Sequence, residues 1–359
     1  MVKPTIREVA VEAGVSLGTA SRVINGRADV NAEMKRRVER AIEKLRYTPN
    51  AVAQSMRLQS THTVGILIRD FSSPAFVSFA NVTQSLLFQA GYVPLIAGYD
   101  DKPQRELEIL HAFAHRRIDG LIVTSSSDTN ADLVAARMRL GVPTILFDRD
   151  PDDVHDTIAV EHREGIKQAV RYLLQLGHRR VALLTGQRAV RPARERISGF
   201  KEAVSGAGEL LDARIVRAGS FSPEFALAET IELLRAPARP TAIIAGGVSM
   251  LPGVLRGIRS CGLRVPDDVS VIGSTNPEIA ELVSPSITEL RVDYTAIGRQ
   301  ASELMLGRLK GGIDGPPRVL RFDTSLIQRD SCGPPANRTR AALGGRTRTS
   351  ARRQVEGVK

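Results

Sequence analysis

Residues 16–25 combine polar side chains with a helical pattern that indicates contact with nucleic acid. Ser16, Ser21 and Arg22 are too polar to be buried together, so we expect them to face outward. A guanidinium such as that of Arg22 can donate two hydrogen bonds to O6 and N7 of a guanine, which is worth about 1–3 kcal/mol of discrimination between bases. The chemistry indicated is therefore recognition of base edges.

Patterns that suggest catalysis or metal binding lack the setting that such chemistry needs. Residues 14–18 fit the hydrolase pattern Gly-x-Ser-x-Gly, but a nucleophile elbow needs a strand before the serine, and a helix is predicted there. His111 and His115 lie four residues apart on a predicted helix without a third ligand, which favours a solvated helix face. No phosphate-binding loop or dinucleotide fingerprint occurs. We expect no enzyme, no cofactor and no metal site.

Two short helices joined by a tight turn position the polar segment. Thr5 to Glu8 form a capping box, and apolar residues follow at helical spacing to Ala13. Gly14 ends this helix, and Ser16 can cap a second helix over residues 17–25. Such a pair is a helix-turn-helix, whose second helix lies in the DNA major groove. A third helix is predicted from Asn31, with an apolar face formed by Val38, Ile42 and Leu45.

The order of these features resembles the LacI/GalR family of bacterial transcription regulators. The matching stretches are residues 5–10, 13–16, 21–26 and 47–53, and weaker matches run to about residue 330. The resemblance implies an N-terminal all-α helix-turn-helix headpiece and an α/β two-lobed core of the periplasmic-binding-protein-like kind. In that family the two lobes close around a small molecule.

The resemblance also implies which headpiece residues contact DNA. Leu17, Gly18 and Arg22 match positions at base edges, where Leu17 can touch a thymine methyl and Gly18 offers no side chain. Phosphate contacts fix the position of a protein on the duplex but do not read its sequence. The resemblance implies such contacts for Thr5, Ser16, Ser21, Asn25, Asn31, Tyr47 and Asn50. It also implies a DNA contact at Ala53. Four of these, Thr5, Ser16, Asn31 and Asn50, can also cap helices.

Residues 47–61 form a predicted connector with a short helix over 51–58. A helix of this length is marginal in water, so we expect it to order on DNA against a partner's copy. The family usually has Leu where this chain has Met56; two such side chains wedge into a central base step and kink the duplex. Arg57 can enter the minor groove or contact phosphate. The wedge implies a homodimer on a near-palindromic double-stranded DNA operator.

Positive charge is concentrated at the two ends of the chain, whose net charge is +11. Residues 1–60 carry 11 Lys and Arg against 6 Asp and Glu, and residues 331–359 carry 7 against 1. The remaining residues carry 32 of each sign. A polyanionic partner is expected at the ends and not across the middle.

From residue 62 to 330 the pattern alternates between apolar strands and helices. Strands are predicted at 64–68, 93–97, 121–124, 144–147, 181–185, 242–245 and 269–272. Helices are predicted between them, for example at 103–116, 163–177, 197–207 and 294–310. This alternation predicts parallel sheets covered by helices, and its length predicts two lobes. Residues 331–359 lack apolar periodicity and are predicted to be a disordered basic tail.

A ligand-binding site is implied between the lobes. Matches to the family indicate that Phe71, Phe76, Asp148, Arg196, Phe221 and Asn276 line it. The Arg196 fork suits hydroxyls or carboxylates, and Asp148 can accept from sugar hydroxyls. Three polar clusters depart from the family, at Glu161-His162, Gly247-Val248 and residues 273–276. A common polyol is therefore in doubt; the alternatives are a less hydroxylated ligand, a phosphorylated one held by Arg188, Arg191, Arg194 and Arg196, or none.

No segment is long and apolar enough to cross a membrane, no secretory signal is visible, and two distant cysteines suit a reducing cytoplasm. We expect a cytoplasmic transcription repressor that binds DNA as a dimer and responds to a sugar, sugar phosphate or purine-like effector. The alternatives are a solute-binding protein and a regulator without an effector response.

Overall fold

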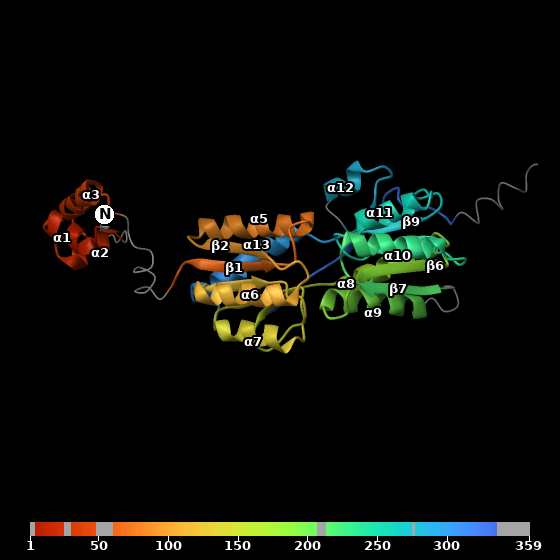
Figure 1. Cartoon of the computed structure of the whole chain (residues 1–359), viewed down its shortest axis with the longest axis horizontal. Coiled ribbons are helices and arrows are strands. Elements are labelled where there is room, and N and C mark those ends of the chain that lie inside the picture. Colours follow the sequence, from red (N-terminus) through yellow and green to blue (C-terminus); the bar gives the residue numbers. More distant parts are fainter. Residues whose placement is uncertain (1–3, 25–29, 48–59, 207–212, 275–276, 336–359) are drawn as a thin grey trace, which may run out of the picture. The chain divides into compact units, whose positions relative to one another are not determined.

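The computed structural model describes residues 4–24, 30–47, 60–206, 213–274 and 277–335. The chain forms two compact units, Met1–His62 and Thr63–Lys359. The first is helical and the second contains two α/β lobes (Figure 1).

The first unit is a three-helix bundle of α1 (Ile6–Ala13), α2 (Leu17–Ile24) and α3 (Ala32–Leu45). The predicted capping box is present, because the Thr5 hydroxyl accepts from the Glu8 N–H and the Glu8 carboxylate accepts from the Thr5 N–H. Gly14 ends α1 in the left-handed region (φ 60°), where glycine is unstrained. The core buries Val9, Ala13, Val38 and Ala41, and the predicted Ile42 and Leu45 pack against it while partly buried.

Lobe 1 is built on a six-stranded sheet in the order β11-β5-β4-β3-β1-β2, with all strands parallel. Its strands are β1 (Thr63–Ile68), β2 (Val93–Gly98), β3 (Gly120–Val123), β4 (Thr144–Phe147), β5 (Asp156–Val160) and β11 (Val319–Phe322). Its helices are α5 (Pro74–Gln89), α6 (Pro103–His115), α7 (Ala131–Leu140) and α13 (Tyr294–Leu309).

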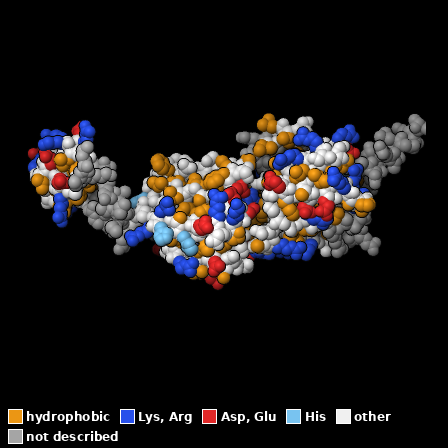
Figure 2. Space-filling model, viewed as in Figure 1, with side chains coloured by type: hydrophobic (Ala, Val, Ile, Leu, Met, Phe, Trp, Pro, Cys, Tyr) orange, Lys and Arg blue, Asp and Glu red, His pale blue; other side chains and the backbone are white. Residues whose placement is uncertain are grey.

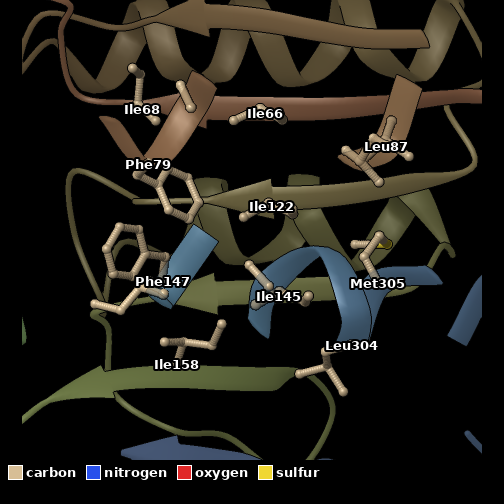
Figure 3. Packing of buried hydrophobic residues seen from close by; sticks show 14 of the residues in the cluster. Ile66, Ile68, Phe79, Leu87, Ile122, Ile145, Phe147, Ile158, Leu304 and Met305 are labelled. Carbon is tan, nitrogen blue, oxygen red and sulfur yellow. The ribbon is translucent and has the colours of Figure 1, made fainter. Parts of the chain in front are cut away.

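One face of this sheet packs on α5 and α13. Ile66, Ile122 and Ile145 point from the strands toward Phe79 and Leu87 of α5 and Met305 of α13 (Figure 3). The rings of Phe79 and Phe147 stack with centroids 4.7 Å apart. The opposite face packs on α6 and α7 through a second apolar cluster that includes Leu67, Leu110 and Leu133. The sheet is buried on both faces, as a parallel sheet must be.

Lobe 2 repeats the plan with the sheet order β12-β10-β9-β8-β6-β7, in which only β12 runs antiparallel to its neighbour. Its strands are β6 (Arg180–Gly186), β7 (Ala213–Gly219), β8 (Ala242–Ala245), β9 (Ser270–Gly273), β10 (Thr288–Arg291) and β12 (Ser325–Ile327). Its helices are α8 (His162–Gln175), α9 (Arg191–Gly206), α10 (Pro223–Arg235), α11 (Leu251–Ser260) and α12 (Pro277–Leu282).

The chain passes between the lobes three times, after β5, after β10 and after β11. The two-lobed α/β fold predicted from the alternation is therefore present. All seven predicted strands exist, and none of their ends is shifted by more than one residue. The pattern missed β5, β7, β10, β11 and β12, and β11 pairs with a strand that lies far away in the chain, β5.

Two predicted boundaries need correction. Helix α9 begins at Arg191 and not at residue 197, because Pro192 occupies its first turn, where the missing N–H is harmless. The ordered core also continues past residue 330. Ser331 is fully buried and its hydroxyl donates to the Val271 carbonyl at 2.6 Å, while the Gly333 N–H donates to the Ser270 hydroxyl at 3.0 Å. Residues 331–335 therefore belong to lobe 2, and the rest of the predicted tail lies outside the described residues.

Acidic and basic side chains are interspersed over the face of the two lobes in Figure 2, in keeping with their balanced charge. No helix in the described ranges is long and apolar enough to span a membrane.

Candidate DNA-binding and ligand-binding sites

Helix α2 presents an outward face that is free of core contacts. Ala20 is fully buried beneath it, while Ser16, Gly18 and Arg22 are exposed and Leu17 is 45% exposed. The Ser16 hydroxyl accepts from the Thr19 N–H at 3.1 Å and so caps the helix. The Arg37 guanidinium donates to the Gly14 carbonyl at 2.9 Å and holds α3 against the turn before α2. The turn and the start of the helix are thus fixed by the Ser16 cap and by Arg37.

The remaining predicted DNA contacts divide into three groups. Thr5 and Asn31 cap α1 and α3, so each has a structural role beside any contact with phosphate. Tyr47 packs against the headpiece core and its N–H donates to the Ile42 carbonyl at 2.9 Å, whereas Ser21 is half-buried on α2. The predictions for Asn25, Asn50, Ala53, Met56 and Arg57 lie outside the described residues.

A cavity of about 240 Å³ lies between the two lobes. The carboxyl ends of β1, β2, β3 and β4 border it from lobe 1, and those of β6, β7 and β8 border it from lobe 2. Ligands in open parallel sheets bind at this edge. Its wall includes four residues named from the sequence, namely Phe76, Asp148, Arg196 and Phe221.

Two predicted ligand contacts are not in this wall. Phe71 is 54% exposed, and its ring lies beside Gly98 and not on the cavity. Asn276 lies outside the described residues. The wall also contains Arg69, Tyr99, Arg149 and Tyr294, which were not named as ligand contacts. Arg69 and Tyr99 directly follow strands β1 and β2, so their position at a strand end was the signal that could have identified them.

Asp148, His162 and Arg196 form a buried chain of hydrogen bonds across the junction of the lobes. The Asp148 carboxylate lies 2.7 Å from His162 Nε2, and Arg196 Nη2 lies 3.1 Å from His162 Nδ1. A carboxylate only accepts and a guanidinium only donates, so Nε2 carries the proton and Nδ1 accepts. Burial, and then the positive charge of Arg196, lower the pKa of His162 to about 4. His162 is therefore neutral at neutral pH.

The charges of this chain are set by the same contacts. Burial alone would raise the pKa of Asp148, but His162, Arg196 and Arg191 together hold it below its ordinary value. Arg191 Nη1 donates to Asp148 Oδ1 at 3.2 Å and to the Val160 carbonyl at 2.9 Å. Asp148 is therefore an anion whose two oxygens already have partners.

The idea that four arginines together hold a phosphorylated ligand needs correction. Arg191 is paired with Asp148, and Arg194 is paired with Asp128 and Asp150. Arg188 is exposed and does not line the cavity. Of the four, only Arg196 belongs to the cavity wall.

Phe221 occupies a slot made by two glycines. A Cβ built on Gly247 would lie 2.5 Å from the Phe221 ring, and one built on Gly186 would also overlap that ring. The guanidinium carbons of Arg69 and Arg196 lie 5.4 and 5.5 Å from the ring centroid, within the range of cation–π attraction. The Gly247-Val248 departure thus has a structural reason, since it makes room for an aromatic wall.

Comparison with known families supports both parts of the chain. Residues 5–50 match the family described as bacterial regulatory proteins, lacI family. Residues 170–332 match the periplasmic binding protein-like domain. The first match covers the three-helix unit and the second covers most of lobe 2.

Individual relatives extend the match over nearly the whole chain. The HTH-type transcriptional repressor PurR of Erwinia tasmaniensis is 32% identical over 329 residues, which is 91% of this chain and 96% of that protein. The PurR repressor of Vibrio vulnificus is 30% identical over 91% of this chain and 98% of its own length.

Two solved structures share the fold. A lac repressor dimer bound to operator and the anti-inducer ONPF has a TM-score of 0.78 at 26% identity, covering 92% of this chain and 100% of that one. A transcriptional regulator CelR–cellobiose complex has a TM-score of 0.67 at 28% identity, with the same coverage.

Proposed function

This chain belongs to the LacI family of bacterial regulatory proteins, and we propose that it is a transcription repressor of the cytoplasm that binds a near-palindromic operator as a homodimer and responds to a small-molecule effector. The observation that carries the proposal is the outward face of α2. Its polar and apolar side chains, Ser16, Leu17 and Arg22, are exposed on a helix that the bundle already holds in place. Recognition helices of this kind enter the major groove.

The cavity between the lobes supports the effector role. Three chain crossings join the lobes, and both lobes contribute to the cavity wall. A ligand that contacts both lobes favours one lobe angle over another, and a change in lobe angle changes the affinity for operator. Operator must then change the affinity for the effector by the same factor. The lac repressor dimer bound to operator and anti-inducer is a relative in which both kinds of ligand are present.

The test is a comparison of specific with non-specific DNA affinity. Operator-like duplexes are selected from a random pool by the full chain, and binding is measured by fluorescence anisotropy against a scrambled duplex. Arg22→Ala should lower the ratio of the two affinities by roughly 5- to 150-fold, because the lost base contact is worth about 1–3 kcal/mol.

Arg36→Ala is the matched control, since Arg36 is an exposed arginine on α3. It removes the same charge and should leave the affinity ratio unchanged. A wild-type chain that stays monomeric and binds all duplexes equally would contradict the proposal and favour a solute-binding role. A ratio that drops equally in both variants would show that α2 does not read bases.

A further inference from the structure

We infer that the effector carries an anionic oxygen group, a carboxylate or a phosphate, attached to an apolar body. The inference rests on the effector role proposed above for the cavity between the lobes. It is carried by the guanidinium of Arg196, which has no carboxylate oxygen within 4.0 Å in the described structure, and by the aromatic wall around it.

Arg196 is a buried cation without a carboxylate partner. It is 6% exposed, and among the described residues no carboxylate oxygen lies within 4.0 Å of its guanidinium. Its hydrogen bonds there go only to His162, which is neutral, so Nε and Nη1 remain available as donors. Burial lowers the pKa of Arg196 to about 10, which still leaves it charged at neutral pH. A buried charge is costly when unpaired, and an anion in the cavity would pair it.

The carboxylates of the cavity wall and of its neighbours do not pair directly with Arg196. Three arginines and two aspartates line the cavity, and three of these five side chains are paired with residues outside the wall. Asp148 is bonded to His162 and Arg191. Arg69 is paired with Asp70 at 2.5 Å, and Arg149 lies 3.9 Å from Asp128. The remaining carboxylate of the wall, Asp101, lies on the loop after β2, where burial raises its pKa. Arg196 is therefore the one arginine of the described wall that has no carboxylate oxygen within 4.0 Å.

The space beside this charge suits an apolar or planar group. Phe76, Phe147 and Phe221 line the cavity, and Arg69 lies over both Phe76 and Phe221 at 5.5 and 5.4 Å from the ring centroids. The hydroxyl of Ser126 is buried in the wall without a hydrogen-bond partner in the described structure. It can donate to one further oxygen. A carboxylate or phosphate on a ring or short apolar chain would match both the guanidinium and the aromatic side chains.

The test is thermal unfolding of the full chain, followed by circular dichroism at constant ionic strength. The anionic probes are acetate, benzoate and inorganic phosphate, and the neutral probes are acetamide, benzamide and cellobiose. We expect benzoate to raise the melting temperature saturably by about 2 °C or more. Acetate or phosphate should raise it less, and the three neutral probes should not change it. A larger response to phosphate than to acetate assigns the group as a phosphate, and the reverse assigns a carboxylate.

Two sets of variants separate the cavity from other anion-binding surfaces. Arg196→Gln should abolish the benzoate shift, and Arg188→Gln, which removes an exposed arginine from the loop before α9, should retain it. If Arg196→Gln does not fold, Arg196→Lys and Arg69→Gln replace it, and each should reduce the shift. An equal shift in wild type and in the Arg196 or Arg69 variants would overturn the inference. A shift with cellobiose or benzamide equal to that with benzoate would overturn it too, while leaving the proposed effector response intact.

Discussion

At the scale of single residues, the cavity depends on pairs whose members lie far apart in the sequence. Phe221 requires that positions 186 and 247 have no side chain. His162 requires a carboxylate on one side and a guanidinium on the other. Gly247 and His162 were both noted as departures from the family pattern, and each has a defined partner in the structure. Neither departure signals a lost binding site.

His162 should make stability depend on pH. The pKa is about 4 in the folded chain, against 6.5 for an ordinary histidine. As the pH falls from 6.5 to 4, the unfolded chain takes up a proton that the folded chain excludes, so the free energy of unfolding decreases, by up to about 3 kcal/mol. His162→Gln should remove this part of the decrease. Urea unfolding across this pH window measures it.

His178 contributes to the same decrease, because burial also lowers its pKa to about 4. The His162→Gln variant should therefore retain part of the dependence on pH. His111→Gln, at an exposed position on α6, is the control and should behave as wild type. An unchanged slope in His162→Gln would mean that His162 is protonated in the folded protein.

At the scale of elements, the N-terminus of α9 is held by the opposite lobe. The Asp128 carboxylate, on the loop between β3 and α7, accepts from the Arg191 N–H at 2.6 Å and from Arg194 at 2.9 Å. A carboxylate at a helix N-terminus satisfies free N–H groups and interacts favourably with the helix dipole. The same helix carries Arg196 into the cavity wall. The Asp128 side chain, which is 3% exposed, therefore links the position of α9 to the lobe angle and to the cavity.

Asp128→Ala should therefore destabilise the fold and loosen the contact between the lobes. Loss of a helix cap and of the partner of Arg194 should lower the free energy of unfolding by about 1–3 kcal/mol. Small-angle X-ray scattering should show a larger radius of gyration at equal oligomeric state. Asp153→Ala, at an exposed position in the same lobe, should change neither quantity. A stability loss without any change in scattering would show that Asp128 caps α9 but does not control the lobe angle.

At the scale of the whole molecule, the excess of positive charge lies outside the two-lobed core. The core is balanced, whereas the headpiece and the last 29 residues carry the excess of positive charge. Binding to DNA releases counterions in proportion to the phosphates that are neutralised, so affinity should fall steeply with salt. The basic residues of the C-terminal segment all lie beyond residue 335. The residues before that point are part of lobe 2.

Two truncations should separate these roles. A chain that ends at residue 335 should lose non-specific DNA affinity but keep its operator preference and its stability. A chain that ends at residue 330 should also unfold more easily, because His178 and Ser270 would lose their bonds to Gly333. Thermal unfolding and anisotropy with operator and scrambled duplexes measure both effects. Loss of operator preference in the chain that ends at residue 335 would assign a specific role to the basic segment.

The sequence alone determined the features that depend on neighbours in the chain. The capping box at Thr5, the turn at Gly14 and the exposed face of α2 follow from local spacing, because a short helix is defined by its caps and its apolar stripe. The central strands were equally clear, since a strand buried on both faces is a continuous apolar run.

Only the tertiary structure decided which side chains meet between the lobes. Arg69, Asp148, Arg196 and Phe221 lie up to 152 positions apart in the sequence (221 − 69), and no local pattern specifies their distances. The same holds for β11 and β12, which owe their place to partners across the chain. Charge pairing in a buried site depends on geometry within a few ångströms. That geometry left Arg191 and Arg194 paired and Arg196 free of a carboxylate partner among the described residues.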